Sequence, residues 1–249
     1  MNKVLTMFVL AASACAHKVA GPLPSSVASL NERMRTAGGS FNAYSCEARI
    51  TYFGKEGRAK GSASLVTAKP ASMRYELHGP HGGTILAFAT DGERLTMIDF
   101  KKSRFVEGPA TPETIDHLIQ FAPLHLSAPR WVDMLFGQVV IDSSATLSAE
   151  KDGWMARWIE RGITREVAID PETSRVKRMR ASVGNDTLSE VEVRNHDASG
   201  LPTSLHIEVP ASNVDMTIEL RDVARLEELD PTAFVLEPPA GVTIERAEP

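Results

Sequence analysis

The chain has 249 residues, of which 43% are hydrophobic and 24% charged, a composition typical of globular proteins. All-β folds of this length often form a single domain. The formal net charge is −5, and acidic and basic residues are interspersed along the chain. A phosphate backbone is a poor partner for such a surface, so we expect no binding of nucleic acid.

The first fifteen residues, MNKVLTMFVLAASAC, have the layout of an export signal. Lys3 gives a positive start, and the apolar run 4–12 is too short to span a bilayer as a helix. Small residues then lead to Cys15, as in bacterial lipoprotein signals, in which the cysteine is lipidated and becomes the N-terminus. The alternative is an ordinary secretory signal with a chance cysteine. We expect a lipoprotein signal peptide at 1–14, lipid attachment at Cys15, a tether at 15–24 and one domain at 25–249.

Cys46 is the second of the two cysteines in the chain. If Cys15 carries a lipid, Cys46 has no partner for a disulfide. Its neighbours at every second position, Tyr44, Ala48 and Ile50, place it on an apolar strand face. We expect a small buried hydrophobe here rather than a nucleophile.

The domain is expected to begin with a helix. Val27, Leu30, Met34 and Ala37 recur at helical spacing, Ser25 or Ser26 is a suitable N-cap, and the glycine pair at 38–39 ends the pattern.

From there the hydrophobic period is two, which predicts strands with one apolar face. Tyr44, Cys46, Ala48, Ile50 and Tyr52 share one face. Similar alternation covers 59–65, 73–78, 84–90, 94–100, 103–108, 154–158, 163–169, 205–209 and 214–220. One apolar and one solvated face is typical of an antiparallel sheet, and the short spacing indicates a meander or barrel.

The strand rhythm breaks once, between Pro112 and Gly137. Ile115 and Leu118 begin a short helical stripe, and Pro129 is suited to start a second helix that carries Trp131. The expected fold is therefore mainly β with a few α-helices: a strongly curved antiparallel sheet covered by an N-terminal helix and a short helical insert. The patterning leaves open whether the covered face is a filled core or a cavity.

Three stretches resemble the LolA/LolB-like superfamily of lipoprotein carriers: MRYELHGPHGGTILAFATDGERLTMIDFKKSRFVEG, RWVDMLFG, and the tail LDPTAFVLEPPAGVTIER. The lipoprotein signal favours the side of the outer-membrane receptor LolB. The resemblance implies a half-open barrel with helices as a lid and a hydrophobic cavity for the acyl chains of lipoproteins or lipids. Residues expected at that cavity are Tyr44, Ile50, Leu65, Met73, Tyr75 and Leu77 on the sheet, with Leu30, Leu118 and Trp131 on the helices.

The segment HGPHGG at 78–83 lies between two strand-like runs, and its proline and glycines predict a tight hairpin turn. LolB has a Pro-Leu-Gly turn here, whose exposed leucine helps to insert cargo into the membrane. The resemblance therefore implies a membrane-facing loop at Pro80, His81 and Gly82, with His81 at the position of the leucine. Histidine is a poorer membrane wedge, so binding of acyl chains is expected without efficient insertion.

Enzyme motifs are missing from the sequence. It contains no HExxH, no GxSxG and no glycine-rich nucleotide motif, and His78 with His81 supplies only two of the ligands that a zinc site needs. We expect no enzyme, no cofactor and no metal.

The expected partners are acyl chains of lipoproteins or lipids, the membrane through the N-terminal lipid, and a soluble LolA-like carrier, with the protein itself a monomer. The expected location is the cell envelope, at the outer membrane facing the periplasm. The alternative function is a lipid-binding envelope sensor or scaffold that does not deliver cargo.

The anchor is testable with Cys15→Ala. We expect this variant to lose membrane association, because the apolar run is too short for a stable span. Membrane fractionation measures the change, with Cys46→Ser as the control that keeps the lipid site. Unchanged membrane association of Cys15→Ala would mean that another segment anchors the chain.

Overall fold

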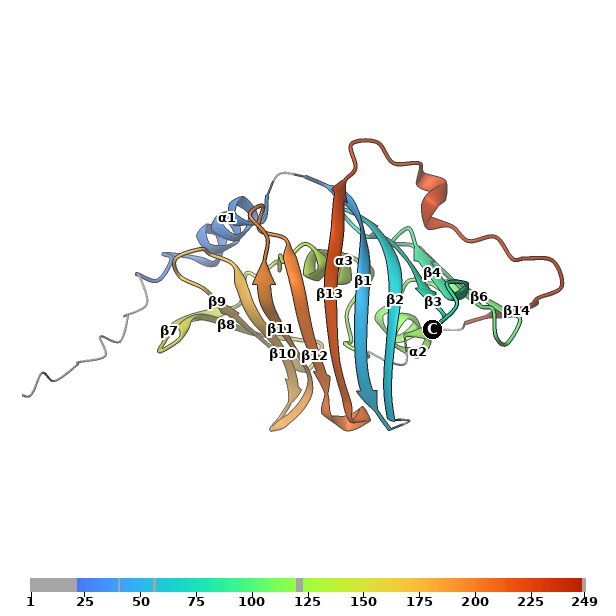
Figure 1. The fold of residues 1–249 in the computed structure, drawn as a ribbon. Helices are drawn as coiled ribbons and strands as arrows, with labels where there is room; N and C mark the ends of the chain where they lie inside the picture. The colour runs from blue at the N-terminus through green and yellow to red at the C-terminus, as the bar shows by residue number, and fades with distance from the viewer. Residues whose placement is uncertain (1–21, 40, 56, 120–122, 248–249) are drawn as a thin grey trace, which may run out of the picture.

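A computed structural model describes residues 22–39, 41–55, 57–119 and 123–247. Cys15, the expected signal peptide and most of the expected tether lie outside these residues. The described part forms one large curved sheet of fourteen strands, with helices on its concave face (Figure 1). The expected fold class is confirmed.

The strands follow one another across the sheet in the order β14-β6-β5-β4-β3-β2-β1-β13-β12-β11-β10-β9-β8-β7. Neighbours are antiparallel, except that β14 pairs parallel with β6. The bounds are β1 Ala43–Gly54, β2 Gly57–Ala68, β3 Ser72–His78, β4 Thr84–Thr90, β5 Arg94–Asp99, β6 Arg104–Pro109, β7 Thr146–Glu150, β8 Gly153–Glu160, β9 Ile163–Ile169, β10 Val176–Val183, β11 Asp186–His196, β12 Pro202–Val209, β13 Val214–Arg225 and β14 Thr243–Arg246.

The helices lie where the sequence predicts them. α1 (Val27–Ala37) is capped by the Ser26 hydroxyl, which accepts a hydrogen bond from the Ser29 amide, and ends at Gly38. α2 (Pro112–Leu118) and α3 (Ala128–Leu135) each carry a proline in the first turn, where its missing N–H costs no helical hydrogen bond. The predicted helical insert is confirmed. Among the described residues, no helix is both long and apolar enough to cross a membrane.

The main core lies between the concave face and the helices. Tyr44 of β1 is fully buried, and its hydroxyl donates a 2.9 Å hydrogen bond to the backbone carbonyl of Leu135. The Tyr44 ring meets Phe136 edge-on, with ring centroids 5.0 Å apart. This contact fixes the C-terminal end of α3 against the centre of the sheet.

α1 is tied to the segment that follows α3. The Asn31 side chain donates to the Ile141 carbonyl at 2.8 Å and accepts from the Ile141 amide at 2.9 Å. Leu30 and Met34 on the same helix are buried in the main core. The parts of the helical cover are therefore bonded to one another as well as packed on the sheet.

Four strands lack a sequence prediction. β10 and β11 contain bulges, between Val176 and Arg178 and again between Val193 and Asn195, and a bulge breaks the period of two. β7 is mostly solvent-exposed, and β14 is exposed along all four residues, so neither strand has a clear apolar face.

The convex face is only partly solvated, which corrects the expectation of one wet face. A C-terminal strap, residues 226–242, crosses the convex side of the first half of the sheet (Figure 1). Phe234 of the strap packs with Ala43 and Ala68, and Leu236 packs with a second cluster. That cluster contains Ala87, Ala89, Ile98 and Phe105. The strands β4–β6 are therefore buried on both faces.

Tyr44→Phe tests the link between α3 and the sheet. The Leu135 carbonyl belongs to the last turn of α3 and has no helical donor, so removing the hydroxyl leaves a buried acceptor unpaired. We expect a loss of about 1–3 kcal/mol in the free energy of unfolding, measured by urea denaturation. Tyr52→Phe is the control, because the Tyr52 hydroxyl makes no hydrogen bond within the described residues. Equal midpoints for both variants would contradict the role of the bond.

Candidate functional site

The residues expected to line a cavity lie together on the concave side, but they occupy two environments. Tyr44, Leu65, Met73, Leu118 and Trp131 are buried in the main core, with Leu30. Ile50, Tyr75 and Leu77 are partly buried and pack against that core. The centre of the concave face is therefore filled with side chains, and its open part lies toward one end of β1–β3.

An edge hollow of about 690 Å³ opens at that end. We use this name for the space lined on its apolar side by Ile50, Tyr52, Ala59, Gly61, Leu77 and Met216. Two of the residues expected at the cavity, Ile50 and Leu77, belong to it.

The edge hollow exists because β2 offers little side-chain volume there. Gly61 pairs in register with Ile50, and Ala59 pairs with Tyr52. A Cβ atom on Gly61 would already lie 3.4 Å from the Leu77 Cδ1 atom, in van der Waals contact. Small residues at alternate positions of β2 thus leave the large neighbours on β1 and β3 without a covering partner.

The rim of the edge hollow is cationic. Lys101, after β5, lies at the rim, and none of the residues that line the hollow is acidic. Arg49 and Lys60 also border it, but alternation along β1 and β2 places their side chains on the opposite face from Ile50 and Gly61. A positive rim above an apolar floor fits an amphiphile with an anionic head and an apolar tail.

The turn 79–83 borders the edge hollow through Gly79 and Pro80. The Gly79 amide donates to the Gly83 carbonyl at 2.8 Å, and β3 and β4 pair on either side, so the predicted hairpin turn is confirmed. Pro80 and His81 are exposed, and Gly82 has a φ of +85°, which suits glycine. His78 instead lies on β3, with its Nε2 atom 2.8 Å from the Ser64 Oγ atom.

A second space lies beneath the α3 region, over β8–β11, and sequence reasoning missed it. Its apolar lining includes Trp158, Val167, Met179 and Val191, and its volume is about 50 Å³, room for a few water molecules. Part of the lining comes from β10 and β11, whose bulges interrupt the hydrophobic period of two in the sequence. We call this space the inner slot.

An ion-pair network borders the inner slot. Glu160 accepts from the Arg130 guanidinium at 3.2 Å and lies 3.5 Å from that of Arg165. Arg165 also donates to the His125 carbonyl at 2.7 Å, which ties β9 to the segment between α2 and α3. Burial lowers the pKa of Arg165. These contacts hold the helical cover against the second half of the sheet.

Cys46 is buried, as the sequence predicts. Burial, with a smaller effect of the neighbouring Glu47, raises the pKa of its thiol to about 12. The thiolate is the reactive form, so this side chain packs as an inert hydrophobe.

No protein-family model and no curated protein sequence matches the chain. Solved structures do match. A LolA superfamily protein from Nitrosomonas europaea aligns with a TM-score of 0.59 at 11% identity, over 85% of this chain and 98% of the other. The chain has a LolA-like fold.

Two further structures support the LolA-like fold. A DUF1329 family protein from Desulfovibrio piger aligns with a TM-score of 0.61 at 11% identity, over 83% of this chain and 94% of its own. A domain described as an outer membrane lipoprotein-sorting protein, from Vibrio parahaemolyticus, aligns with a TM-score of 0.60 at 8% identity, over 82% and 94% of the two chains. At these identities the likeness establishes the LolA-like fold and no more.

Proposed function

We propose that this chain is a lipid-anchored envelope protein that binds acyl chains of lipoproteins or lipids and takes part in lipoprotein localisation to the outer membrane. The edge hollow is the observation that carries the proposal. It offers an apolar floor of Ile50, Leu77 and Met216 at the open end of a concave face, beside the exposed turn at His81. The LolA-like fold and the lipoprotein-sorting description of one neighbour agree with it.

Burial of an acyl chain against this floor is favourable by about 0.8 kcal/mol for each CH₂ group removed from water. A carboxylate or phosphate at the chain's head would meet Lys101 at the rim. The ligand therefore enters tail first along β1–β3, with its head at the edge of the sheet. No catalytic group is needed for this role, and we propose none.

Deeper insertion requires movement of the helical cover. The inner slot holds about 50 Å³, far less than an acyl chain fills, and the Glu160 network lies along its border. Separation of Arg165 from the His125 carbonyl would free the α2–α3 segment from β9. In this proposal the structure is the closed state of the carrier.

The second candidate is a sensor or scaffold that holds a lipid without delivering it. Two observations favour it: the centre of the concave face is filled by Tyr44, Met73 and Trp131, and the turn tip carries polar His81. A transfer assay to liposomes separates the two candidates, because only the carrier releases its ligand to an acceptor membrane.

Binding at the edge hollow is tested with a fluorescent fatty acid. We expect the wild type to bind the probe, and Leu77→Glu to weaken binding at least tenfold because the new carboxylate faces the apolar floor. Gly61→Leu, whose backbone is not in the left-handed region, should weaken it similarly by filling the space. Thr51→Leu, between Ile50 and Tyr52 and so on the opposite face of β1, is the control. Absence of binding by the wild type would contradict the site, and so would binding as tight as that of the wild type by folded Leu77→Glu and Gly61→Leu.

Delivery is tested with His81→Leu. An exposed leucine partitions into a bilayer better than an imidazole does, so we expect faster transfer of bound acyl probe to liposomes and an unchanged probe affinity. His117→Leu, on α2, is the matched control for added hydrophobicity. Equal transfer rates for His81→Leu and the wild type would contradict a membrane role for the turn.

A further inference from the structure

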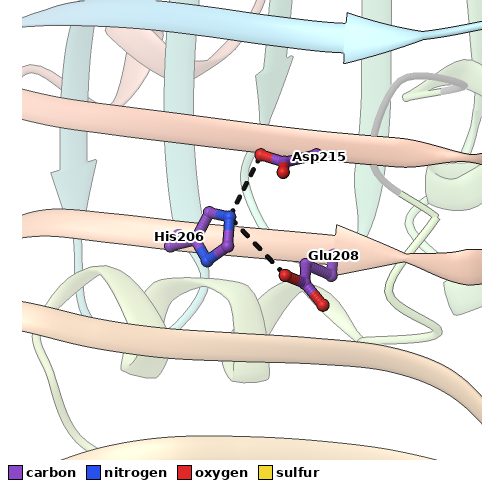
Figure 2. A group of neighbouring side chains, drawn as sticks. All are labelled: His206, Glu208 and Asp215. Atoms are coloured by element: carbon purple, nitrogen blue, oxygen red, sulfur yellow. Dashed lines mark hydrogen bonds and ion pairs between the residues drawn. The ribbon is translucent and has the colours of Figure 1, made fainter.

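The convex face of β12 and β13, away from the lipid site, carries a compact group of polar side chains. His206, Glu208 and Asp215 point toward one another there (Figure 2). The His206 Nε2 atom lies 3.0 Å from the Asp215 Oδ1 atom and 3.8 Å from the Glu208 Oε1 atom. We propose that these three residues form a binding site for a divalent cation of the zinc class.

The spacing of the donor atoms suits one ion. The imidazole nitrogen and one oxygen of each carboxylate all lie within 4.8 Å of one another. Tetrahedral zinc with bonds of about 2.0–2.2 Å separates its ligand atoms by about 3.4 Å. Small side-chain rotations close that difference, because Glu208 and Asp215 are each about half exposed and free to move.

The strand register creates a local excess of negative charge. Glu208 lies directly opposite Asp215 across β12 and β13. It also lies opposite Glu190 across β11 and β12, but Glu190 is within 3.8 Å of both Arg178 and Arg180, so the uncompensated pair is Glu208 with Asp215. Like charges at directly opposed positions destabilise a sheet. Among the described residues, neither Glu208 nor Asp215 forms an ion pair with a lysine or arginine, and His206 is their shared partner. A bound dication removes this repulsion.

The imidazole is already oriented for metal binding. His206 pairs in register with Glu192, whose Oε2 atom lies 3.8 Å from the His206 Nδ1 atom. This distance is too long for a hydrogen bond, and the same Glu192 oxygen accepts from the Arg194 Nε atom at 3.0 Å. The hydrogen-bond contact of the ring is between the His206 Nε2 atom and the Asp215 Oδ1 atom, 3.0 Å apart, and it turns Nε2 toward the two carboxylates. The His206 side chain is only 14% exposed, so the neighbouring side chains hold this orientation.

The mixed donor set favours zinc over magnesium or calcium. Magnesium and calcium bind almost entirely through oxygen, whereas zinc accepts one nitrogen and two carboxylate oxygens and keeps a fourth position for water. The ion would join β12 to β13 next to their connecting turn, η1 (Pro210–Ser212). It would thus act as a clamp on this hairpin, and the proposal does not depend on the function of the opposite face.

Zinc titration of the full-length protein, purified with chelator, tests the site. We expect one zinc ion per chain by calorimetry and a melting temperature that rises with zinc, since a ligand of the folded state stabilises it. His206→Ala, Glu208→Gln and Asp215→Asn should each weaken binding at least tenfold. Magnesium and calcium should leave the melting temperature unchanged.

His125→Ala is the matched control. His125 and Asp116 form another close histidine–aspartate pair, 2.7 Å apart, and the described residues offer no third ligand beside it. This variant should bind zinc as the wild type does. A wild type that does not bind zinc, or one whose binding persists in Glu208→Gln and Asp215→Asn, would overturn the proposal. Loss of zinc binding in His125→Ala would place the ion at the other histidine–aspartate pair and would also overturn the proposal.

Discussion

A sheet with one broad apolar face must cover that face, and the rest of this structure depends on how the concave side is covered. Three short helices do most of the covering. The buried hydrogen bond from the Tyr44 hydroxyl to the Leu135 carbonyl fixes α3 over the centre of the sheet. The Asn31 side chain joins α1 to Ile141, in the segment that follows α3. The cover ends before the far end of β1–β3, and the edge hollow lies where it ends. Incomplete coverage is thus the physical origin of the candidate lipid site.

The two halves of the sheet are held in different ways. In the first half, β4–β6 are buried on both faces, because the C-terminal strap places Leu236 on their convex side, while Phe234 packs with Ala43 and Ala68. The second half keeps a polar convex face, where cross-strand charges meet in register. His206 lies at the centre of that charged surface. The convex side of the sheet therefore presents two chemically distinct surfaces, one covered by the strap and one polar.

Charge and shape coincide at the edge hollow. The β1–β2, β3–β4 and β5–β6 connections lie at the same edge, because successive strands are antiparallel. Exposed Phe53 and Phe100 lie beside these connections, where the Arg58 guanidinium carbon is 5.0 Å from the Phe53 ring centroid and Lys101 follows Phe100 in the chain. Apolar rings next to cations suit contact with an anionic amphiphile, so the surroundings agree with the proposed direction of ligand entry.

Much of the architecture was predictable from local patterns. The period of two in β1–β6, the helical spacing in α1, and the prolines that start α2 and α3 are properties of neighbouring residues, so the sequence is enough to predict them. The hairpin turn at 79–83 was also predictable from neighbouring residues, its proline and glycines. The face shared by Tyr44, Ile50 and Leu77 was also predictable, because alternation assigns every second residue to one side.

Local alternation assigns residues to a face of the sheet, whereas the packing of distant segments sets what each face contacts. Tyr44 and Leu77 follow the same alternation, yet one is sealed by α3 and the other borders an open hollow, since only folding places the helical cover. The contacts of the strap are also long-range. The residues around Leu236 do not predict that it packs with Ala87 and Ala89. His206 and Glu208 are two apart on one strand, but Asp215 joins them only through the β12–β13 register. Contacts between distant segments depend on the whole chain's packing, which local periodicity does not contain.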